Sequence, residues 1–386
     1  MSPGPTLTLD RLRRHAVARS LFRPTTLGRA LHRLGFVQAD PIRAPARAQD
    51  LVLRHRVTGY RAGDLERRYR TLDVEEDFLV NYGFVSHQVQ KLMHPRLRGI
   101  SRSAAQRRRT EELLAFVRQK RTVHPRDVDA HFAHGTVTNY WGGSSSATTH
   151  LLEDMHYRGL LRVVRRDAGI RLYGAIDHGP AASGSRERES RLDALIDVVV
   201  GVYAPLPQGT LAWLVNRLRY ATPQWTAHLK SALVRAKRRL AHARLEGVDW
   251  YWPPDESVPR RAEPVVRLLA PFDPVVWDRR RFQLLWGWAY RFEAYTPAPK
   301  RQFGYYALPL LWCDQVIGWA NVSVREGRLH PDIRYVDCMP SEPLFVRELD
   351  SELDRMRLFL GVGAVERGHA KAHPHNHARR RKDEAR

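Results

Sequence analysis

The sequence predicts an α+β protein in which tandem winged-helix domains are followed by a C-terminal antiparallel β domain. Residues 109–180 read as three helices and a hairpin, which extends a helix-turn-helix by two strands. Residues 190–258 show a similar succession of helix, break, helix and strand. From residue 262 onward, short alternating apolar segments are separated by turn residues, as in an antiparallel sheet or small barrel.

We expect five segments along the 386 residues. They are a helical, winged-helix-like domain with a candidate catalytic motif (1–108), a winged helix (109–180), a further winged-helix-like domain (190–258), a β-rich domain (262–365) and a disordered basic tail (366–386). The small, polar residues of 179–189 predict a linker. The tail has almost no apolar content, so it cannot bury enough surface to fold.

The candidate motif follows the second helix of the chain. An apolar face that repeats every three to four residues stops at Gly35, which is typical of a helix end. Gln38 and Asp40 come next, and Pro41 disfavours a helix through Asp40. Side chains two apart in an extended link point to the same side, so a carboxamide and a carboxylate face one space. The alternative is that Asp40 only caps the helix that starts near Ala46.

The segment 109–180 carries the clearest DNA-binding pattern. Thr110 is expected to cap its first helix, and a turn is expected at 167–169, between the strands of the hairpin. The third helix would enter the major groove with Ser144, Ser145, Thr148 and Thr149 early in it. Arginines suited to phosphates lie on the wing: Arg162, Arg165, Arg166 and Arg171. The alternative is a winged helix that serves only as a scaffold or protein contact.

In the β-rich domain we expect turns at 313–315 and 326–327 and a closing helix over 343–360. The chain carries 64 Lys and Arg against 41 Asp and Glu, a formal charge of +23. This excess indicates a polyanionic partner, with nucleic acid ahead of a membrane surface. We expect double-stranded DNA as the partner of a monomer, with no protein partner and no membrane association.

Cys313 and Cys338 are the only cysteines, and two distant cysteines form neither a zinc site nor a disulfide framework. We therefore expect no metal and no cofactor. A reducing cytoplasmic location fits, since the sequence shows no signal peptide and no run of 18 apolar residues.

Two separated stretches resemble one known family. The segment VQADPIRAPARAQDLVLRHR, which contains Gln38 and Asp40, is similar to the Gln-hydrophobic-Asp motif of the YcaQ/AlkX branch of winged-helix DNA glycosylases. The related AlkZ branch of interstrand-crosslink glycosylases has Gln-hydrophobic-Gln instead. The stretch from Leu268 to Trp319, which begins LLAPFDPVVWDRRRF, resembles the same branch. The resemblance implies a bacterial, nucleoid-associated DNA repair enzyme that releases N7-alkylated purines and unhooks interstrand crosslinks.

The two motif residues suit that chemistry. A purine alkylated at N7 leaves as a neutral base, so no strong general acid is needed. Asp40 would stabilise the cationic sugar and accept a proton from the attacking water, and Gln38 would hold that water. No lysine adjoins the motif, so we expect a monofunctional hydrolase rather than a Schiff-base lyase.

The resemblance also marks one departure and further DNA contacts. Relatives carry a histidine where Phe84 or Val85 stands here. Either His87 substitutes from nearby or the group is lacking, and His87 also reads as an ordinary surface histidine. The downstream block is expected to pack close to the DNA site, with Arg279, Lys300 and Arg301 as phosphate contacts. The alternative function is a non-catalytic winged-helix DNA-binding protein or transcription regulator.

Overall fold

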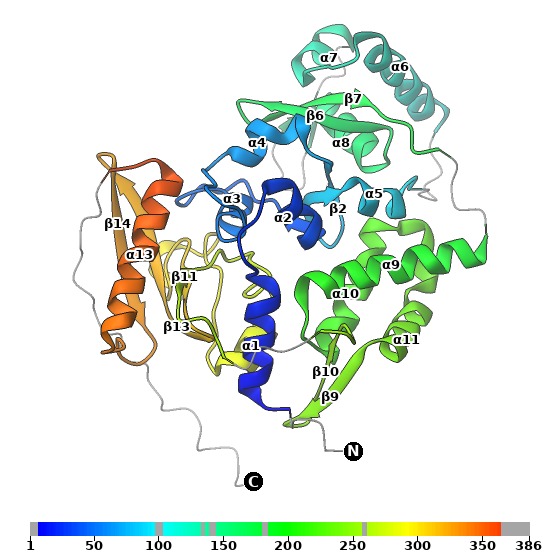
Figure 1. The fold of residues 1–386 in the computed structure, drawn as a ribbon. Helices are drawn as coiled ribbons and strands as arrows, with labels where there is room; N and C mark the ends of the chain where they lie inside the picture. Colours follow the sequence, from blue (N-terminus) through cyan, green and yellow to red (C-terminus); the bar gives the residue numbers. More distant parts are fainter. Residues whose placement is uncertain are drawn as a thin grey trace.

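The computed structural model describes residues 7–96, 103–132, 136–138, 144–179, 184–256 and 261–363, without the side chains of 136–138 and 144–146. Figure 1 shows the stretch 7–96 in the middle of the molecule, with 103–179 above it, 184–256 to its right and the C-terminal stretch 261–363 to its left. The tail expected from 366 lies outside the described residues. None of the described helices is both long and apolar enough to cross a membrane.

The first stretch forms a small three-stranded sheet surrounded by short helices. Its elements are α1 (Leu9–Ser20), α2 (Leu27–Leu34), β1 (Phe36–Gln38), α3 (Ala48–Leu53), α4 (Asp64–Arg68), β2 (Val74–Phe78), β3 (Tyr82–Ser86) and α5 (His87–Met93). The strands pair antiparallel in the order β1-β3-β2. Helix α2 ends at Gly35, which adopts φ +69° and lets the chain reverse directly into β1. This helix end was predicted from the sequence.

The second stretch has the expected order of three helices and a hairpin. Its elements are α6 (Ala104–Lys120), α7 (Pro125–Phe132), the short strands β4 (Thr136–Thr138) and β5 (Ser144–Ser146), α8 (Ala147–Tyr157), β6 (Leu161–Asp167) and β7 (Ile170–Ala175). An isolated bridge joins Val123 to Tyr173 of β7. The expected cap was wrong: Ser103 caps α6 with a reciprocal bond to Gln106, and Thr110 is buried inside the helix.

The third stretch repeats that plan with three paired strands. It contains α9 (Ser185–Tyr203), β8 (Leu206–Pro207), α10 (Gln208–Ala221), α11 (Leu229–Arg239), β9 (Ala241–Leu245) and β10 (Val248–Trp252), with strand order β8-β10-β9. The linker prediction was wrong for residues 185–189, which belong to α9. Straight-chain residues favour a helix there, and Glu187 pairs with Arg191 one turn later at 2.6 Å.

The C-terminal stretch contains the antiparallel sheet predicted from the sequence. Its elements are β11 (Val266–Leu268), α12 (Arg279–Trp286), β12 (Leu308–Trp312), β13 (Gln315–Arg325), β14 (Arg328–Tyr335) and α13 (Pro343–Leu360). The strands lie in chain order as an open sheet. Cys313 and Glu326 adopt positive φ angles of 56° and 50° at the expected turns, and the closing helix has the predicted bounds.

The two stretches that carry the family resemblance are joined by a buried ion pair. The guanidinium of Arg56 donates to both carboxylate oxygens of Asp273, at 2.8 and 3.0 Å, and neither side chain is exposed to solvent. Removing either partner would leave an uncompensated buried charge, so this contact fixes the downstream block against the first stretch. The fold thereby places Trp277 beside the end of β1.

Candidate functional site

Gln38 is the last residue of β1 and lies opposite Gly83 of β3. A Cβ on Gly83 would come within 2.3 Å of the carbonyl oxygen of Val37, so a side chain at this position would push β1 and β3 apart. The carboxamide oxygen of Gln38 accepts hydrogen bonds from the indole N–H of Trp277 at 2.8 Å and from the amide of Asn81 at 2.9 Å. These contacts hold the side chain in one orientation.

Asp40 follows two residues later and is half-buried. Its carboxylate accepts the backbone N–H of Ile42 at 2.9 Å, and its own N–H donates to Gln49 at 3.3 Å. Burial raises the pKa of Asp40, and the bond from Ile42 opposes this only in part. No cation in the described part of the chain forms an ion pair with it. A carboxylate in this state is a stronger base than an ordinary surface aspartate.

The simpler interpretation of Asp40 as a helix cap does not hold. The next helix, α3, begins at Ala48, and its N-cap is Arg47. Asp40 instead closes a local turn onto Ile42, two residues on, as aspartates do in loops. This local bond occupies one carboxylate oxygen.

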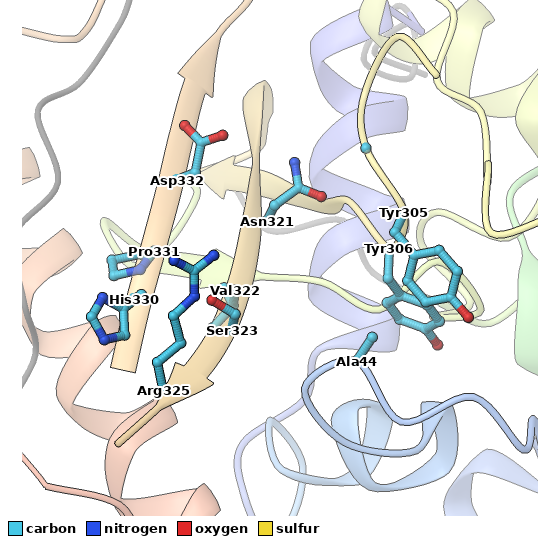
Figure 2. A pocket seen from close by; sticks show the side chains of 11 residues that line it. Ala44, Tyr305, Tyr306, Asn321, Val322, Ser323, Arg325, His330, Pro331 and Asp332 are labelled. Carbon is cyan, nitrogen blue, oxygen red and sulfur yellow. The ribbon is translucent and has the colours of Figure 1, made fainter. Parts of the chain in front are cut away.

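An open groove lies between the loop that contains Ala44 and the C-terminal sheet (Figure 2). Its volume is about 710 Å³, and it is lined by Ala44, Tyr305, Tyr306, Asn321, Ser323, Arg325, His330 and Asp332, among others. Figure 2 shows Tyr305 and Tyr306 side by side next to Ala44, with the polar residues of β13 and β14 on the other side. A groove of this size accepts a drug-sized group.

The hydroxyl of Tyr306 is buried and has no hydrogen-bond partner within the described residues. Burial raises the pKa of Tyr306, and the negative charge of Asp40 raises it further, so the phenol stays protonated. Leaving such a hydroxyl unpaired costs about 1–3 kcal/mol. A native structure that carries this cost at the edge of a groove is suited to a ligand that accepts a hydrogen bond.

The family model for AlkZ-like DNA glycosylases matches residues 31–359. The chain belongs to the AlkZ-like DNA glycosylase family. The solved structure of Streptomyces sahachiroi DNA glycosylase AlkZ matches the fold with a TM-score of 0.62, covering 95% of this chain and 100% of that one at 13% identity. Membership supports a role in DNA repair with DNA as the substrate.

Three phosphate contacts were expected in the downstream block of this AlkZ-like chain, and the structure places their side chains differently. The Arg279 side chain is partly buried and engaged within the protein: it donates to the carbonyls of Val276 and Pro271 and lies 4.5 Å from the ring centre of Tyr290. Lys300 is exposed. Arg301 is partly buried and lies 5.0 Å from the ring centre of Tyr305.

The predicted recognition helix is also corrected in part. Helix α8 starts at Ala147, and Ser145 lies in β5 before it. The side chain of Ser145 is outside the described residues. Thr148 is in α8, but it is fully buried, so a phosphate contact by its side chain is excluded. Helix α8 packs this threonine toward the core because it follows the inward-facing period of Leu152 and Met155.

The wing arginines are mostly engaged within the protein. Arg166 donates to both oxygens of Glu76 at 2.7 and 2.5 Å, and Arg162 pairs with Glu75 at 2.6 Å. The side chain of Arg166 is 18% exposed and that of Arg162 is 37% exposed. Arg165 is exposed and forms no ion pair with the described residues. Of the four predicted wing contacts, Arg165 alone forms no ion pair with the described residues, since Arg171 also pairs with a glutamate.

Strand β2 carries three buried carboxylates, Glu75, Glu76 and Asp77, each about 1% exposed, and the first two are the partners of the wing arginines. Burial would raise the pKa of Asp77, but Arg96 and His94 outweigh it and hold that pKa well below its usual range. Arg166 likewise lowers the pKa of Glu76 against its burial. This cluster joins the first stretch to the second and is structural.

His87 belongs to the edge of the same cluster. One ring nitrogen contacts Asp73, and the other lies 3.0 Å from Glu75. Both nitrogens are therefore engaged by carboxylates, and no bond from His87 to Gln38 or Asp40 occurs among the described residues. Also within them, no group of three or more His, Cys, Asp and Glu side chains could hold a metal ion.

Three neighbours of the motif were not singled out from the sequence for their roles: Asn81, Trp277 and Tyr306. Trp277 and Tyr306 fall in the block that resembles the family, where they were indistinguishable from core aromatics. Asn81 lies in the turn between β2 and β3, and an asparagine there reads as a turn residue.

Proposed function

We propose that this AlkZ-like protein is a monofunctional DNA glycosylase that hydrolyses the N-glycosidic bond of N7-alkylated purines, including those in interstrand crosslinks. One observation carries the proposal. Gln38 and Asp40 stand at the end of one strand, the carboxamide fixed by two donors and the carboxylate without an ion pair among the described residues. This pairing suits the activation of water beside a cationic sugar.

The proposed reaction needs only these groups and water. The water oxygen bonds to C1′ of the sugar, and its proton passes to Asp40. The bond from C1′ to N9 breaks, and its electron pair neutralises the positive charge of the alkylated purine. No lysine in the described part of the chain contacts Gln38 or Asp40, which supports water as the nucleophile rather than an amine.

The groove between the loop that contains Ala44 and the C-terminal sheet supports the choice of substrate. A substituent at N7 projects away from the sugar, and the groove offers about 710 Å³ for it. Tyr306 lines the groove, and the charge of Asp40 acts on its protonated hydroxyl, which we assign to a hydrogen bond with the bound nucleotide. The open shape admits large substituents without requiring a tight pocket around a fully flipped base.

Duplex binding would come from the three helical stretches, which we interpret as tandem winged helices. The shared strand order of the first and third stretches supports this, with the third strand between the other two. Affinity should fall with salt and show little sequence preference, because phosphate neutralisation carries no base information. Salt-independent binding, or binding confined to one operator, would favour the non-catalytic regulator.

The test is single-turnover release of N7-methylguanine from a duplex. Asp40→Asn keeps the shape and the turn onto Ile42 but removes the base, so release should fall by about 10²–10⁴-fold. The rate of release should fall less in Gln38→Ala than in Asp40→Asn. Asp255→Asn, which removes an exposed carboxylate in the third stretch, is the matched control and should release base at the wild-type rate.

DNA affinity should stay equal or rise in Asp40→Asn, since one negative charge near the backbone is removed. Unchanged release by a folded Asp40→Asn protein would remove this residue from the mechanism. No release by the wild-type protein from any N7-alkylated duplex would leave the non-catalytic DNA-binding protein as the better description.

A further inference from the structure

The orientation of the Gln38 carboxamide is set by groups that can only donate. The indole N–H of Trp277 has no acceptor atom, so the Gln38 atom 2.8 Å away must be the oxygen. The Asn81 amide occupies the same oxygen at 2.9 Å. A carbonyl oxygen has two lone pairs, and both are used here. The Nε2 amide of Gln38 forms no hydrogen bond within the described residues.

Asn81 is oriented in turn by Arg217 of α10. The guanidinium donates from one nitrogen to the Asn81 carbonyl at 2.7 Å and from Nε to the carbonyl of Val80 at 2.7 Å. Arginine has no acceptor, so the oxygen of Asn81 must face Arg217 and its NH₂ must face Gln38. The donor direction therefore runs from Arg217 through Asn81 to Gln38.

Aromatic packing from the third stretch holds both ends of this chain. The Trp277 ring lies 4.7 Å from that of Tyr203 and 5.3 Å from that of Trp213, measured between ring centres. The Arg217 guanidinium lies 5.0 Å from the ring centre of Trp213. Since α9 and α10 provide these rings, three segments far apart in the sequence meet at one side chain of the motif.

We propose that Gln38 acts in base release as a hydrogen-bond donor through Nε2, and that Trp277, Asn81 and Arg217 are positioning residues that hold it so. The inference rests on the proposed glycosylase function and specifies the role of one residue in it. The attacking water accepts the N–H of Gln38 through one lone pair and donates a proton to Asp40. Its second lone pair then points at C1′.

For Gln38 to accept a hydrogen bond from the water instead, its carboxamide would have to rotate so that the oxygen and Nε2 exchange places. Its NH₂ would then face two donors, the Trp277 N–H and the Asn81 NH₂, and two hydrogen bonds would be lost together. Each partner would be left unpaired in a half-buried site, at a cost of about 1–3 kcal/mol each. The acceptor role is therefore disfavoured by the surrounding protein before any substrate binds.

Gln38→Glu separates the two roles. A glutamate keeps an oxygen for Trp277 and Asn81, but it presents a second oxygen where the amide N–H stood. The donor role predicts that release falls on the order of 10²-fold, as for the loss of one preorganised donor. The added negative charge favours a cationic sugar, so a fall would not reflect weaker charge stabilisation. Release at the wild-type rate would overturn the proposal.

Asn81→Asp tests the chain of hydrogen bonds from Arg217 through Asn81 to Gln38 without changing the motif itself. The aspartate keeps its bond to Arg217 but offers Gln38 an oxygen in place of a donor, which favours the turned carboxamide. We expect single-turnover release to fall at least tenfold, with duplex affinity and melting temperature near those of wild type. An Asn81→Asp protein that folds and releases base at full rate would contradict the positioning role of Asn81.

Trp277→Phe has a matched control in Trp288→Phe. Both replace an indole in an aromatic cluster, and both remove an N–H bond, which in Trp288 goes to the carbonyl of Val316 at 3.0 Å. Loss of packing should lower the melting temperature in both, whereas only Trp277→Phe should lower release. Equal rates in the two variants would make Trp277 merely structural.

The parent function is judged separately by the wild-type protein, because its failure to release any N7-alkylated purine would refute the glycosylase itself. A readout without catalysis is the indole N–H resonance of Trp277, assigned by its absence in Trp277→Phe. It should shift and exchange faster in Gln38→Ala. An unchanged resonance would mean that the bond to Gln38 is not formed in solution, which would overturn the proposal.

Discussion

Asp40 and the three carboxylates of β2 lie in the same stretch of the chain and are all at least half-buried. They differ in whether an arginine balances their charge. Glu75, Glu76 and Asp77 are each met by an arginine from outside their own strand. Asp40 meets only the backbone N–H of Ile42. Paired carboxylates hold the stretches together, whereas the carboxylate without a cation keeps its capacity to accept a proton.

The same comparison explains why the count of 64 Lys and Arg overstates the number of cations that are free to face DNA. Arg162 and Arg166 were predicted to contact phosphates, but they neutralise Glu75 and Glu76. The guanidinium of Arg279 donates to backbone carbonyls within the protein. An arginine that is paired with an internal carboxylate contributes little to DNA binding. Arg165 and Lys300 are therefore better candidates for phosphate contacts than their more buried neighbours.

The largest expected effect comes from breaking the paired cluster. Asp77→Ala leaves Arg96 and His94 buried without a counter-charge, and such changes typically cost about 3–5 kcal/mol. Denaturant unfolding of Asp77→Ala and Asp40→Asn, side by side, measures the contrast. Asp40→Asn should be at least as stable as wild type. A stable Asp77→Ala protein would show that this cluster is not what joins the stretches.

The next effect concerns Tyr306. Tyr306→Phe removes an unpaired buried hydroxyl, so the free energy of unfolding should stay level or rise by up to about 1–3 kcal/mol. Base release should nevertheless fall about tenfold or more if the hydroxyl contacts the nucleotide. Tyr290→Phe, which removes a hydroxyl bonded to Ala307, is the control and should lose stability while keeping its rate. A Tyr306→Phe protein that releases base at the wild-type rate would contradict the assignment of this hydroxyl to a hydrogen bond with the nucleotide.

The pH dependence of release should reflect the environment of Asp40. Burial raises its pKa above the ordinary 3.8, and the active form is the carboxylate. Release should therefore fall as pH drops through this raised value. The folded state binds this proton more tightly than the unfolded state, so ionised Asp40 lowers stability at neutral pH. Single-turnover rates, with melting curves at each pH, test this. An acid limb at or below 3.8 would contradict it.

The smallest effect separates the two neighbouring wing arginines. Arg165→Ala should weaken duplex binding at any sequence and reduce the slope of log affinity against log salt by about 1, with little change in stability. Arg166→Ala should lower the melting temperature, because Glu76 would lose its bidentate partner. Titrations at several salt concentrations decide between them. Equal salt slopes for Arg165→Ala and wild type would remove the wing from the DNA interface.

Local signals in the sequence determined several features of this protein. The end of α2 at Gly35, the turns at Cys313 and Glu326 and the bounds of α13 follow from the preferences of a few adjacent residues. The resemblance of two stretches correctly indicated the family, because it depends on residue identities.

Other features were decided only by the tertiary structure. The pairing of Arg166 with Glu76 joins residues 90 positions apart, and the bond from Trp277 to Gln38 spans 239. Whether an arginine meets a carboxylate or solvent, and which end of a carboxamide faces outward, depends on such long-range neighbours. The buried Thr148 has the same origin, since a local pattern does not show which face of a helix the rest of the chain will cover.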